Sequence, residues 1–426
     1  MNLNYCDPKE AFALIKPHSR LFIHGSAATP TYLVRQMALH KDLFEHVEVV
    51  CISVYGDFPI AQSGMEDHFY INALFVSDPV RAAINEGRGG YIPVFLSEIP
   101  ELFKRNVLPL DVAIIQVSPP DEHGFVSLGT SVDAARAAVD HSKLVIAQVN
   151  PMMPRTSGDA LIHSSRIQKA IWHEEALHEV DYASKTGSVE QEIGRLIANL
   201  IENGSTLQMG IGSIPDSVLS KLGNHKNLGI HTEMLSDGVI PLIMSGAVNN
   251  SQKKINQGKT VTSFCAGTRK LYDFVNNNLD FAFLDVDYVN EPGIISKNPK
   301  VVAINSCIEI DITGQVCSDS IGTWAYSGVG GQMDFIRGAA MSEDGKPIIA
   351  LPSRTGKGVP RIVSSLKPGA GVVTSRAHVH WVVTEYGAVN LFGKNMHQRA
   401  VDLLKLAHPD DREALEKAVR MRFGKQ

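Results

Sequence analysis

The fold is decided by the stretch Leu21-Phe-Ile-His-Gly25-Ser-Ala-Ala-Thr-Pro30. Its apolar start predicts a short buried strand that ends at Gly25, and Pro30 then opens a helix, because proline is favoured in the first helical turn. The β-branched run at residues 47–54 predicts the next strand. A strand, a helix and a strand in this order predict a βαβ unit and therefore a parallel sheet.

The same pattern recurs in the second half of the chain. Gly25 and Gly210 are 185 residues apart, as are Pro30 and Pro215, so both stretches read G-x-x-x-x-P. Each lies between a short apolar strand and a helix. We therefore predict an internal duplication that gives two related open α/β domains, with a cleft between them as the binding site.

The domain boundary is expected near residue 185, because a helix start follows it. Ser188 is a favoured N-cap residue, and Gln191 occupies the capping-box position. Apolar residues then recur at helical spacing, and Gly204 occupies the place of a C-cap glycine. The predicted domains are residues 1–185 and 186–426.

Short apolar or β-branched runs predict further strands in both halves. These runs are residues 73–76, 91–96, 112–117, 144–149, 206–209, 228–232, 261–264, 281–286, 301–304, 308–312, 347–351, 371–373 and 379–383. Residues 215–222 predict a helix. The tail at 398–419 is helical in pattern, with Asp410 and Glu413 near the start of its last helix.

The composition is that of an ordinary soluble protein. Of its 426 residues, 44% are apolar and 20% are charged, which is too apolar for a disordered chain. The net charge of −5 provides no basic field for nucleic acid or an anionic membrane. The N-terminus lacks the pattern of a secretory signal, and no window approaches 18 uncharged apolar residues. We therefore expect a cytoplasmic protein.

The cysteines favour reduced thiols. There are five, an odd number, and no two are spaced as C-x-x-C. This pattern argues against a disulfide framework and against a zinc site. The cysteines are Cys6, Cys51, Cys265, Cys307 and Cys317.

The first candidate site is the loop Gly210-Ile-Gly212, between a strand and a helix. Backbone amides at a helix N-terminus can hold an anion such as a pyrophosphate or an oxyanion. The alternative is a plain tight turn. The dinucleotide fingerprint G-x-G-x-x-G is incomplete, because Pro215 occupies the position of its third glycine.

The second candidate is Glu233, in His231-Thr-Glu-Met-Leu-Ser-Asp-Gly238. It follows the predicted strand after the glycine loop, and open parallel sheets bind ligands at the carboxyl ends of their strands. A carboxylate there serves as a base, a metal ligand or a nucleophile, or it only caps the next turn. Alternation places His231 on the same face, but no third ligand completes a metal site.

The third candidate is Gly328-Val-Gly-Gly-Gln-Met-Asp-Phe-Ile-Arg-Gly338. Adjacent glycines allow a ligand to approach the backbone closely. Gln332, Asp334 and Arg337 would orient that ligand or lock the loop, and an ion pair between Asp334 and Arg337 is the structural alternative. The chain has no G-x-S-x-G elbow, no P-loop and no H-E-x-x-H helix, which disfavours the enzymes that use them.

Together, the Gly210-Ile-Gly212 loop, residues 231–238 and residues 328–339 resemble the acetyl-CoA hydrolase/transferase family. Within it, the chain is most similar to the branch that handles 4-hydroxybutyrate or butyrate and acetate. The resemblance covers nearly the whole chain, and residues 348–353 and 384–387 also look typical of the family's second domain.

The resemblance implies two α/β domains of related fold and a glutamate nucleophile at the position of Glu233. It implies that Gly210 and Asn305 polarise the acyl carbonyl or hold the oxyanion. The positions that would contact coenzyme A are Gln208, Met209, Gly210, Ile211, Gly212, Ile308, Gly330 and Gly331. For the phosphates of coenzyme A, the basic loop with Arg354, Lys357 and Arg361 is the candidate, and a solvated surface loop is the alternative.

The resemblance also implies an activity. Coenzyme A would pass between a short-chain acyl-CoA and acetate, butyrate or 4-hydroxybutyrate, by a ping-pong mechanism through a glutamyl-CoA thioester. Coenzyme A is then a substrate, with no metal and no tightly bound cofactor. An acid pocket is expected near Ser26, Gln62 or Met65, and a homodimer or higher homo-oligomer is expected.

Three alternatives stay open at this point. The first is an acetyl-CoA hydrolase that uses the same glutamate. The second is a non-catalytic protein that binds coenzyme A, since a fold does not fix a function. The third is a dehydrogenase, which rests on the glycine loop alone.

Overall fold

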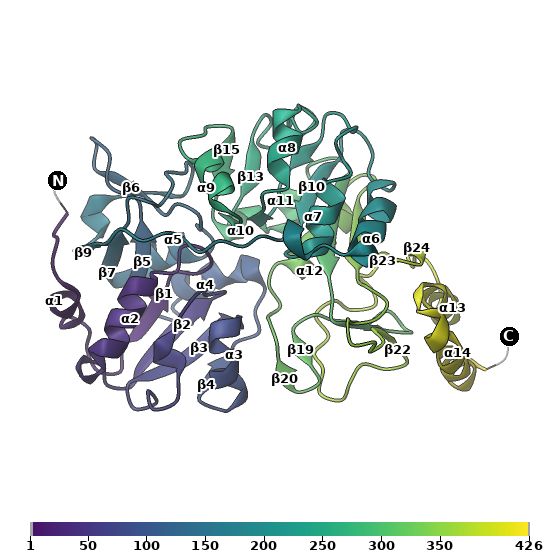
Figure 1. The fold of residues 1–426 in the computed structure, drawn as a ribbon, viewed down its shortest axis with the longest axis horizontal. Helices are drawn as coiled ribbons and strands as arrows, with labels where there is room; N and C mark the ends of the chain where they lie inside the picture. The colour runs from purple at the N-terminus through teal and green to yellow at the C-terminus, as the bar shows by residue number, and fades with distance from the viewer. Residues whose placement is uncertain (1–2, 425–426) are drawn as a thin grey trace. The chain divides into compact units, whose positions relative to one another are not determined.

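The computed structural model describes residues 3–424, apart from the side chain of Lys185, and it divides into two compact units (Figure 1). The first unit holds the chain as far as Val180, together with Val261–Val289 and Ala325–Gly330. The second unit holds the remaining segments. Two short segments of the predicted second domain thus belong to the first unit, and the predicted domain limits at 1–185 and 186–426 remain a prediction.

The first unit is built on a seven-stranded parallel sheet in the order β4-β3-β2-β1-β5-β7-β9. The strands are β1 (Arg20–Ile23), β2 (Val47–Ile52), β3 (Phe69–Phe75), β4 (Gly89–Tyr91), β5 (Leu110–Val117), β7 (Ser142–Val149) and β9 (Lys169–Trp172). Its sheet strands are largely buried, as expected for a parallel sheet covered on both faces.

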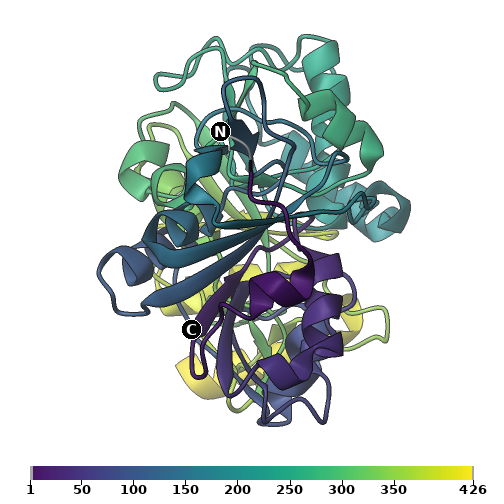
Figure 2. The ribbon, with the colours of Figure 1, turned by 90° about the vertical axis from the view of Figure 1, so that its left-hand side faces the viewer.

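Helices cover both faces of this sheet. From β1 the chain passes through α2 (Thr31–Leu39) to β2, and from β5 it passes through α5 (Ala135–His141) to β7, in the opposite direction along the sheet. Because such crossovers are right-handed, opposite directions place the two helices on opposite faces. In Figure 2 the purple helices lie on one side of the strands and blue helices lie on the other.

The other elements of the first unit are shorter. The helices are α1 (Pro8–Phe12), α3 (Asp78–Asn85), α4 (Ile99–Lys104), α9 (Arg269–Val275) and α10 (Val286–Val289). The strands are β6 (Phe125–Ser127), β8 (Leu161–His163), β13 (Thr260–Thr262), β14 (Phe264–Cys265) and β15 (Phe281–Phe283). Thr260, the first residue of β13, is counted with the second unit.

The second unit has a six-stranded sheet in the order β11-β10-β16-β21-β23-β24. The strands are β10 (Thr206–Met209), β11 (Gly229–Ile230), β16 (Val301–Ser306), β21 (Lys346–Ala350), β23 (Trp381–Thr384) and β24 (Gly387–Asn390). All neighbours are parallel except β23 and β24.

Helices and short strands complete the second unit. The helices are α6 (Ser188–Ala198), α7 (Ser213–Leu219), α8 (Val239–Met244), α11 (Pro292–Ile295), α12 (Gln332–Met341), α13 (Met396–Leu406) and α14 (Pro409–Phe423). The short strands are β12 (Met234–Leu235), β17 (Glu309–Asp311), β18 (Val316–Cys317), β19 (Ser320–Ile321), β20 (Trp324–Ala325) and β22 (Ile362–Val363). Ala325, the last residue of β20, is counted with the first unit.

The two sheets share five strands in the same order. The series β2-β1-β5-β7-β9 of the first unit matches β11-β10-β16-β21-β23 of the second, and every pair in both series is parallel. In each unit, the strand of this series that comes first in the chain, β1 or β10, is followed by a loop and then by a helix. The prediction of two related open α/β halves is therefore confirmed.

Some local predictions were wrong. Residues 371–373 form no strand, and of residues 91–96 only Tyr91 belongs to one. The N-cap of α6 is Gly187, whose N–H donates to Oε2 of Glu190 at 3.0 Å, so the capping interaction begins one residue earlier than predicted. The helix ends at Ala198, before Gly204, which occupies a separate turn with φ of 80°.

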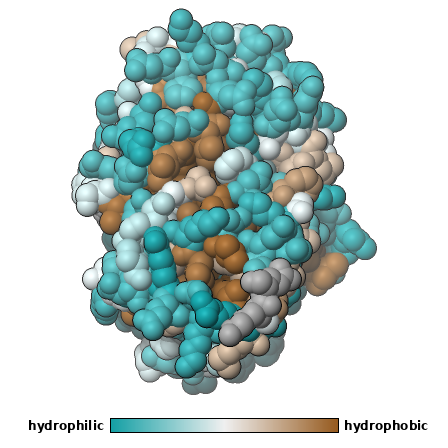
Figure 3. All heavy atoms as spheres, turned by 90° about the vertical axis from the view of Figure 1, so that its right-hand side faces the viewer, coloured by the Kyte–Doolittle hydropathy of each residue, from teal (hydrophilic) through white to brown (hydrophobic). Residues whose placement is uncertain are grey.

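The surface around the C-terminal helices is mixed. Figure 3 shows the face that is at the right in Figure 1, where α13 and α14 lie. Most of its side chains are hydrophilic, and several hydrophobic patches lie among the hydrophilic ones. None of the helices in residues 3–424 combines the length and the apolar character needed to cross a membrane.

Candidate active site

Two of the three predicted motifs lie at the same edge of the second sheet. The loop Gly210–Gly212 follows β10, and Glu233 comes three residues after β11. Because β10 and β11 are parallel neighbours, their carboxyl ends meet at one edge. This is the edge at which open α/β sheets bind ligands.

The carboxylate of Glu233 is held by a buried asparagine. The Asn290 Nδ2 donates to Glu233 Oε2 at 2.8 Å and also to Asp334 Oδ2 at 3.2 Å. Asn290 and Asp334 are buried, whereas Glu233 is partly exposed. One amide therefore bridges two carboxyl groups, and its own Oδ1 has no hydrogen-bond partner among the described residues.

These surroundings change the acidity of Glu233. Burial raises the pKa of its carboxyl to about 7, the hydrogen bond from Asn290 lowers it, and the negative charge of Asp334 raises it. Burial disfavours the charged form, and a like charge adds to that effect. At neutral pH the carboxyl group therefore populates both its protonated and its ionised form. Strongly shifted carboxyls of this kind cluster at functional sites.

Gly331 explains why the third motif needs adjacent glycines. A Cβ atom at this position would lie 1.6 Å from Glu233 Oε2 and 2.2 Å from Asn290 Nδ2. Only glycine therefore leaves room for the carboxylate and the amide. Gly331 is also the N-cap of α12, whose first turn supplies Asp334. Two residues of this motif therefore affect Glu233. Gly331 leaves room for its carboxylate, and Asp334 raises its pKa.

The first glycine loop is tightly packed at its start and open at its end. The Gly210 N–H donates to the Ile304 carbonyl at 2.8 Å, so in this structure the amide is used within the sheet. A Cβ on Gly210 would lie 2.9 Å from the same carbonyl oxygen. Gly212 has φ of 124° and begins α7, while Ile211 is 39% exposed. The role of Gly210 at an oxyanion remains a prediction.

Asn305 lies beside Gly210 and pairs with Gln208. The Asn305 Nδ2 donates to Gln208 Oε1 at 3.0 Å, and the reverse contact measures 3.4 Å. A Cβ on Gly210 would lie 3.5 Å from Asn305 Oδ1. Both side chains are buried. The amide pair joins β10 to β16, so the polarising role of Asn305 also remains a prediction.

Three other residues that are predicted to contact coenzyme A have defined positions in the fold, and their contact with coenzyme A remains a prediction. The Met209 N–H donates to Thr232 Oγ1 at 3.1 Å, which ties β10 to the residue before Glu233. The Ile308 N–H donates to the Cys317 carbonyl at 2.8 Å, and Ile308 is partly buried. Gly330 has φ of 57°, a left-handed value that glycine adopts readily.

The basic loop offers fewer free cations than its sequence indicates. The guanidinium of Arg354 makes a two-point contact with Asp411, at 2.8 and 2.6 Å, and a third contact with Asp410 at 3.1 Å. These acids raise the pKa of Arg354 and neutralise its charge. Lys357 is exposed, and the Nε of Arg361 has no hydrogen-bond partner among the described residues.

A cavity of about 640 Å³ lies beside this loop, within the second unit. Its lining includes Ser353, Arg354, Gly356, Arg361 and Tyr386. The cavity places Arg361 where an anionic group can reach it. Lys357 lies in the same loop, but it is not among the residues that line the cavity.

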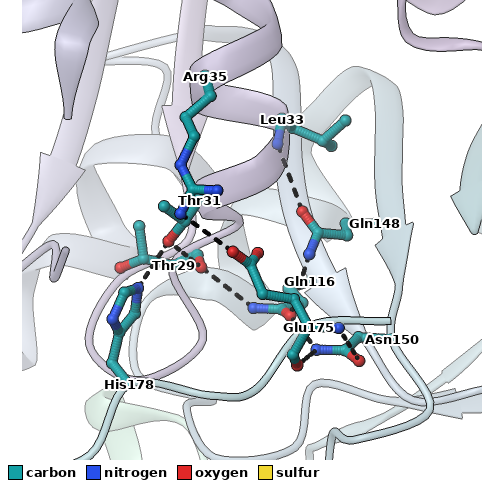
Figure 4. A network of polar contacts seen from close by, with 9 residues as sticks. All are labelled: Thr29, Thr31, Leu33, Arg35, Gln116, Gln148, Asn150, Glu175 and His178. Carbon is teal, nitrogen blue, oxygen red and sulfur yellow. Dashed lines mark hydrogen bonds and ion pairs between the residues drawn. The ribbon is translucent and has the colours of Figure 1, made fainter. Parts of the chain in front are cut away.

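In the first unit, a buried polar network holds the corresponding glycine loop (Figure 4). The Nε2 of Gln116 donates to the carbonyls of Ala28 and Thr29, at 3.2 and 3.1 Å. Its Oε1 accepts from Asn150 at 2.7 Å and from Gln148 at 3.3 Å. The loop between β1 and α2 is thus fixed from β5 and from the end of β7.

The outer part of the network ties α2 to residues 173–178. Figure 4 shows the His178 ring next to Thr31, with 2.6 Å between Nε2 and Oγ1, and Arg35 next to Glu175. Ser26, one of the residues expected near an acid pocket, is buried with φ of 52°. Gln62 is exposed and Met65 is partly buried. No contact in the structure assigns an acid to these three residues.

The contacts of His231 lend no support to a metal site shared with Glu233. The His231 ring lies 6.3 Å from the ring of Phe335, centroid to centroid. Among residues 3–424 no group of three or more histidine, cysteine, aspartate and glutamate side chains is arranged to hold a metal ion.

Asn290 holds the Glu233 carboxylate but could not be predicted from the sequence. It lies in Tyr288-Val-Asn-Glu-Pro292, which matches no motif, and it is 57 residues from Glu233 in the chain. The signal that could have found it is the Asn-Glu-Pro start of a helix, and that signal only indicates a helix boundary.

Residues 4–183 match the acetyl-CoA hydrolase/transferase N-terminal domain, and residues 267–419 match the C-terminal domain of the same family. The chain belongs to the acetyl-CoA hydrolase/transferase family.

Relatives in the family cover nearly the whole chain. A succinyl-CoA:acetate/propanoyl-CoA:succinate CoA transferase of Fasciola hepatica is 53% identical over 96% of this chain and 86% of its own. A 4-hydroxybutyrate coenzyme A transferase of Clostridium kluyveri is 49% identical over 97% of both chains. The structure of a 4-hydroxybutyrate CoA-transferase from Porphyromonas gingivalis covers 99% of this chain and 98% of its own, with a TM-score of 0.85 and 39% identity. Relatives named acetyl-CoA hydrolase are more distant.

The raised pKa of Glu233 predicts a pH-dependent gain in stability when the carboxyl is removed. Between about pH 4.3 and pH 7 the unfolded chain ionises while the folded one stays protonated, so the free energy of unfolding falls as pH rises through this range. Glu233→Gln keeps an acceptor for Asn290 and removes this cost. Urea unfolding should show a gain roughly 2 kcal/mol larger at pH 8 than at pH 5.

The control is Glu343→Gln, which makes the same change at an exposed position of the same unit. Its effect should stay within about 0.5 kcal/mol at both pH values. A gain for Glu233→Gln that does not depend on pH would contradict the assigned acidity.

Proposed function

We propose that this protein is a CoA-transferase that moves coenzyme A between short-chain acyl-CoA esters and free carboxylic acids, with Glu233 as the nucleophile. The proposal rests above all on one observation, the carboxylate of Glu233 fitted between Gly331 and the amide of Asn290. It is supported by the family and by relatives named CoA transferases at 49% and 53% identity.

The chemistry requires an ionised carboxylate. An oxygen of Glu233 attacks the thioester carbonyl, the carbon–sulfur bond breaks, and the thiolate of coenzyme A leaves behind an acyl-glutamyl anhydride. The thiolate then attacks the glutamyl carbonyl of that anhydride and expels the first carboxylate. A glutamyl-CoA thioester remains, and a second acid reverses both steps. The energy of the thioester is conserved, because each bond broken is replaced by one of similar energy.

The surroundings of Glu233 suit both halves of this cycle. A pKa near 7 leaves the carboxylate ionised in a large fraction of molecules at neutral pH while keeping it a better nucleophile than a carboxylate of ordinary acidity. Asn290 holds Oε2 of Glu233, so the carboxylate has a defined orientation. We propose that backbone amides of the two glycine motifs stabilise the oxyanions; losing one such donor typically costs about 100-fold to 1000-fold in turnover.

The acids are proposed as small mono- and dicarboxylates. The names of the two relatives above include acetate, propanoyl, succinate and 4-hydroxybutyrate, which share a carboxylate and a short chain. For the phosphates of coenzyme A we propose Arg361 and Lys357, with Arg354 serving to fix the loop through Asp411. A cytoplasmic location and a homo-oligomeric state also remain proposals.

A hydrolase that uses the same glutamate is the second candidate. It differs only in the group that resolves the glutamyl intermediate, which is water in place of a carboxylate. Thiol release from acetyl-CoA distinguishes the two, because a transferase passes coenzyme A to the second acid and frees no net thiol. We expect thiol release to stay near background with or without acid, while added butyrate, succinate or 4-hydroxybutyrate is converted to its own CoA ester and acetate is released.

Replacing Glu233 by glutamine should abolish transfer and keep binding. The amide has the shape of the carboxylate but cannot form an anhydride, so we expect at least a 1000-fold loss of transfer between acetyl-CoA and butyrate. The dissociation constant for coenzyme A, measured by calorimetry, should change less than threefold. Glu343→Gln serves as the matched control and should keep full activity. Full transfer by Glu233→Gln would refute the nucleophile.

Placing a methyl group on Gly331 should also remove activity. The new Cβ would overlap Glu233 Oε2 and Asn290 Nδ2, so the carboxylate has to leave its position. Because a displacement of about 1 Å can cost about 100-fold, we expect Gly331→Ala to lose at least that factor in kcat.

The control is Gly223→Ala in the same unit, where a Cβ meets nothing within 4 Å. It should change kcat less than twofold. If Gly331→Ala were as active as Gly223→Ala, the close fit around Glu233 would have no part in the reaction.

A further inference from the structure

The strand that precedes Glu233 lies at the edge of its sheet. Within residues 3–424, β11 pairs with β10 on one side and has no named strand on the other, where only an isolated bridge joins Leu228 to Val248. The N–H groups of Gly229 and His231 donate to Ser205 and Leu207 on the β10 side. Alternation along the strand therefore turns both backbone groups of Ile230 toward the outer edge. Buried backbone groups of this kind need partners.

Two side chains of one loop supply those partners. The Ile230 N–H donates to Oδ1 of Asn250 at 2.9 Å, and the Ile230 carbonyl accepts from Nζ of Lys253 at 2.8 Å. Both side chains are buried, with Lys253 only 2% exposed. They replace the hydrogen bonds that a neighbouring strand would make. We call this pair, Asn250 and Lys253, the edge clamp.

The edge clamp is itself fixed in place. The Nζ of Lys253 also donates to the Lys259 carbonyl at 2.7 Å, and its carbon chain packs on Gly229, where a Cβ would lie 2.7 Å from its Cγ. The Nδ2 of Asn250 donates to Thr260 Oγ1 at 3.0 Å. Asn250 has φ of 56°, a left-handed value that asparagine tolerates better than most residues.

Lys253 is costly to bury for a structural contact alone. Burial lowers the pKa of its amine to about 7, and no carboxylate forms an ion pair with it among residues 3–424. A buried amine without a carboxylate loses its hydration and regains only part of that energy from carbonyl acceptors. An apolar side chain could fill the same space but could not hold the Ile230 carbonyl.

Ile230 is three residues before Glu233, and the segment between them is held from the other side as well. The Thr232 Oγ1 accepts the Met209 N–H from β10, opposite the edge clamp. The backbone that carries Glu233 is therefore gripped on both sides of the strand. The edge clamp is made by two side chains from the loop after α8, whereas the other contact uses the side chain of Thr232 itself.

We infer that Lys253 and Asn250 are positioning residues for Glu233, which set the place of its carboxylate by fixing the outward N–H and carbonyl of Ile230. The inference rests on the proposed function of Glu233. It adds to that function a pair of residues that contact neither coenzyme A nor the acid. Their effect is on the rate of the first chemical step and not on binding.

The test is single-turnover formation of the glutamyl-CoA thioester from acetyl-CoA, followed by mass spectrometry of the intact protein. Lys253→Met keeps the carbon chain and removes the donor. We expect its rate constant to fall between about 10-fold and 100-fold, because a small displacement of a reacting group has effects of this size. The final yield of thioester and the dissociation constant of coenzyme A should stay within twofold of the wild type. Lys253→Arg, which keeps a donor, should recover at least part of the rate.

Asn250→Gly is the second variant, since glycine accepts the left-handed conformation and removes both the acceptor for Ile230 and the donor to Thr260. It should also slow loading and leave the yield unchanged. Asn227→Gly is its control, because Asn227 has φ of 59° and contacts Asn249 instead of Ile230. Asn298→Ala is the control for Lys253→Met. Asn298 holds the same loop through the N–H groups of Lys254 and Ile255.

Both controls should lower the melting temperature without slowing the loading step more than twofold. If Lys253→Met loads as fast as Asn298→Ala, or if it weakens binding as much as it slows loading, the positioning role is refuted. If the wild type itself forms no thioester on Glu233, the proposed function fails instead. The two failures are therefore distinguishable.

Discussion

The site depends on one amide shared between two carboxyl groups. Asn290 donates to both Glu233 and Asp334, and without it two acids would face each other in a buried setting. Burial keeps the pKa of Glu233 high, while the amide keeps the ionised form accessible. The same amide fixes one carboxylate oxygen in space. Acidity and orientation, the two properties that a carboxylate nucleophile needs, thus have a common source.

The rest of the second unit can be understood as support for this arrangement. α12 begins at Gly331, where the absence of a side chain admits the carboxylate, and its first turn delivers Asp334. β10 and the edge clamp hold the strand before Glu233 from two sides. The first unit uses a related solution, because a buried Gln116 fixes its own glycine loop from the neighbouring strand.

Much of the fold and part of the site could be predicted from the sequence. Apolar and β-branched runs give the strands, and the repeated G-x-x-x-x-P pattern gives the two related halves, because both signals are local in the chain. Glu233 and Gly331 were found because they lie in long motifs. Asn290 and Lys253 were not, since their roles come from contacts over 57 and 23 residues that leave no local pattern. The pairing of Arg354 with Asp411 was missed for the same reason, and a loop that reads as basic has one of its charges neutralised.

The central claim is that the carboxylate of Glu233 carries coenzyme A during the reaction. The most direct measurement is peptide mapping of protein that has been incubated with acetyl-CoA and then reduced with borohydride, which converts a glutamyl thioester into an alcohol. We expect one modified peptide, in which the side chain of Glu233 has become an alcohol with one oxygen fewer, and no modification when the acyl-CoA is omitted. An unmodified Glu233 in protein that transfers coenzyme A at the full rate, or a modification at another residue, would contradict the role of Glu233 as the nucleophile.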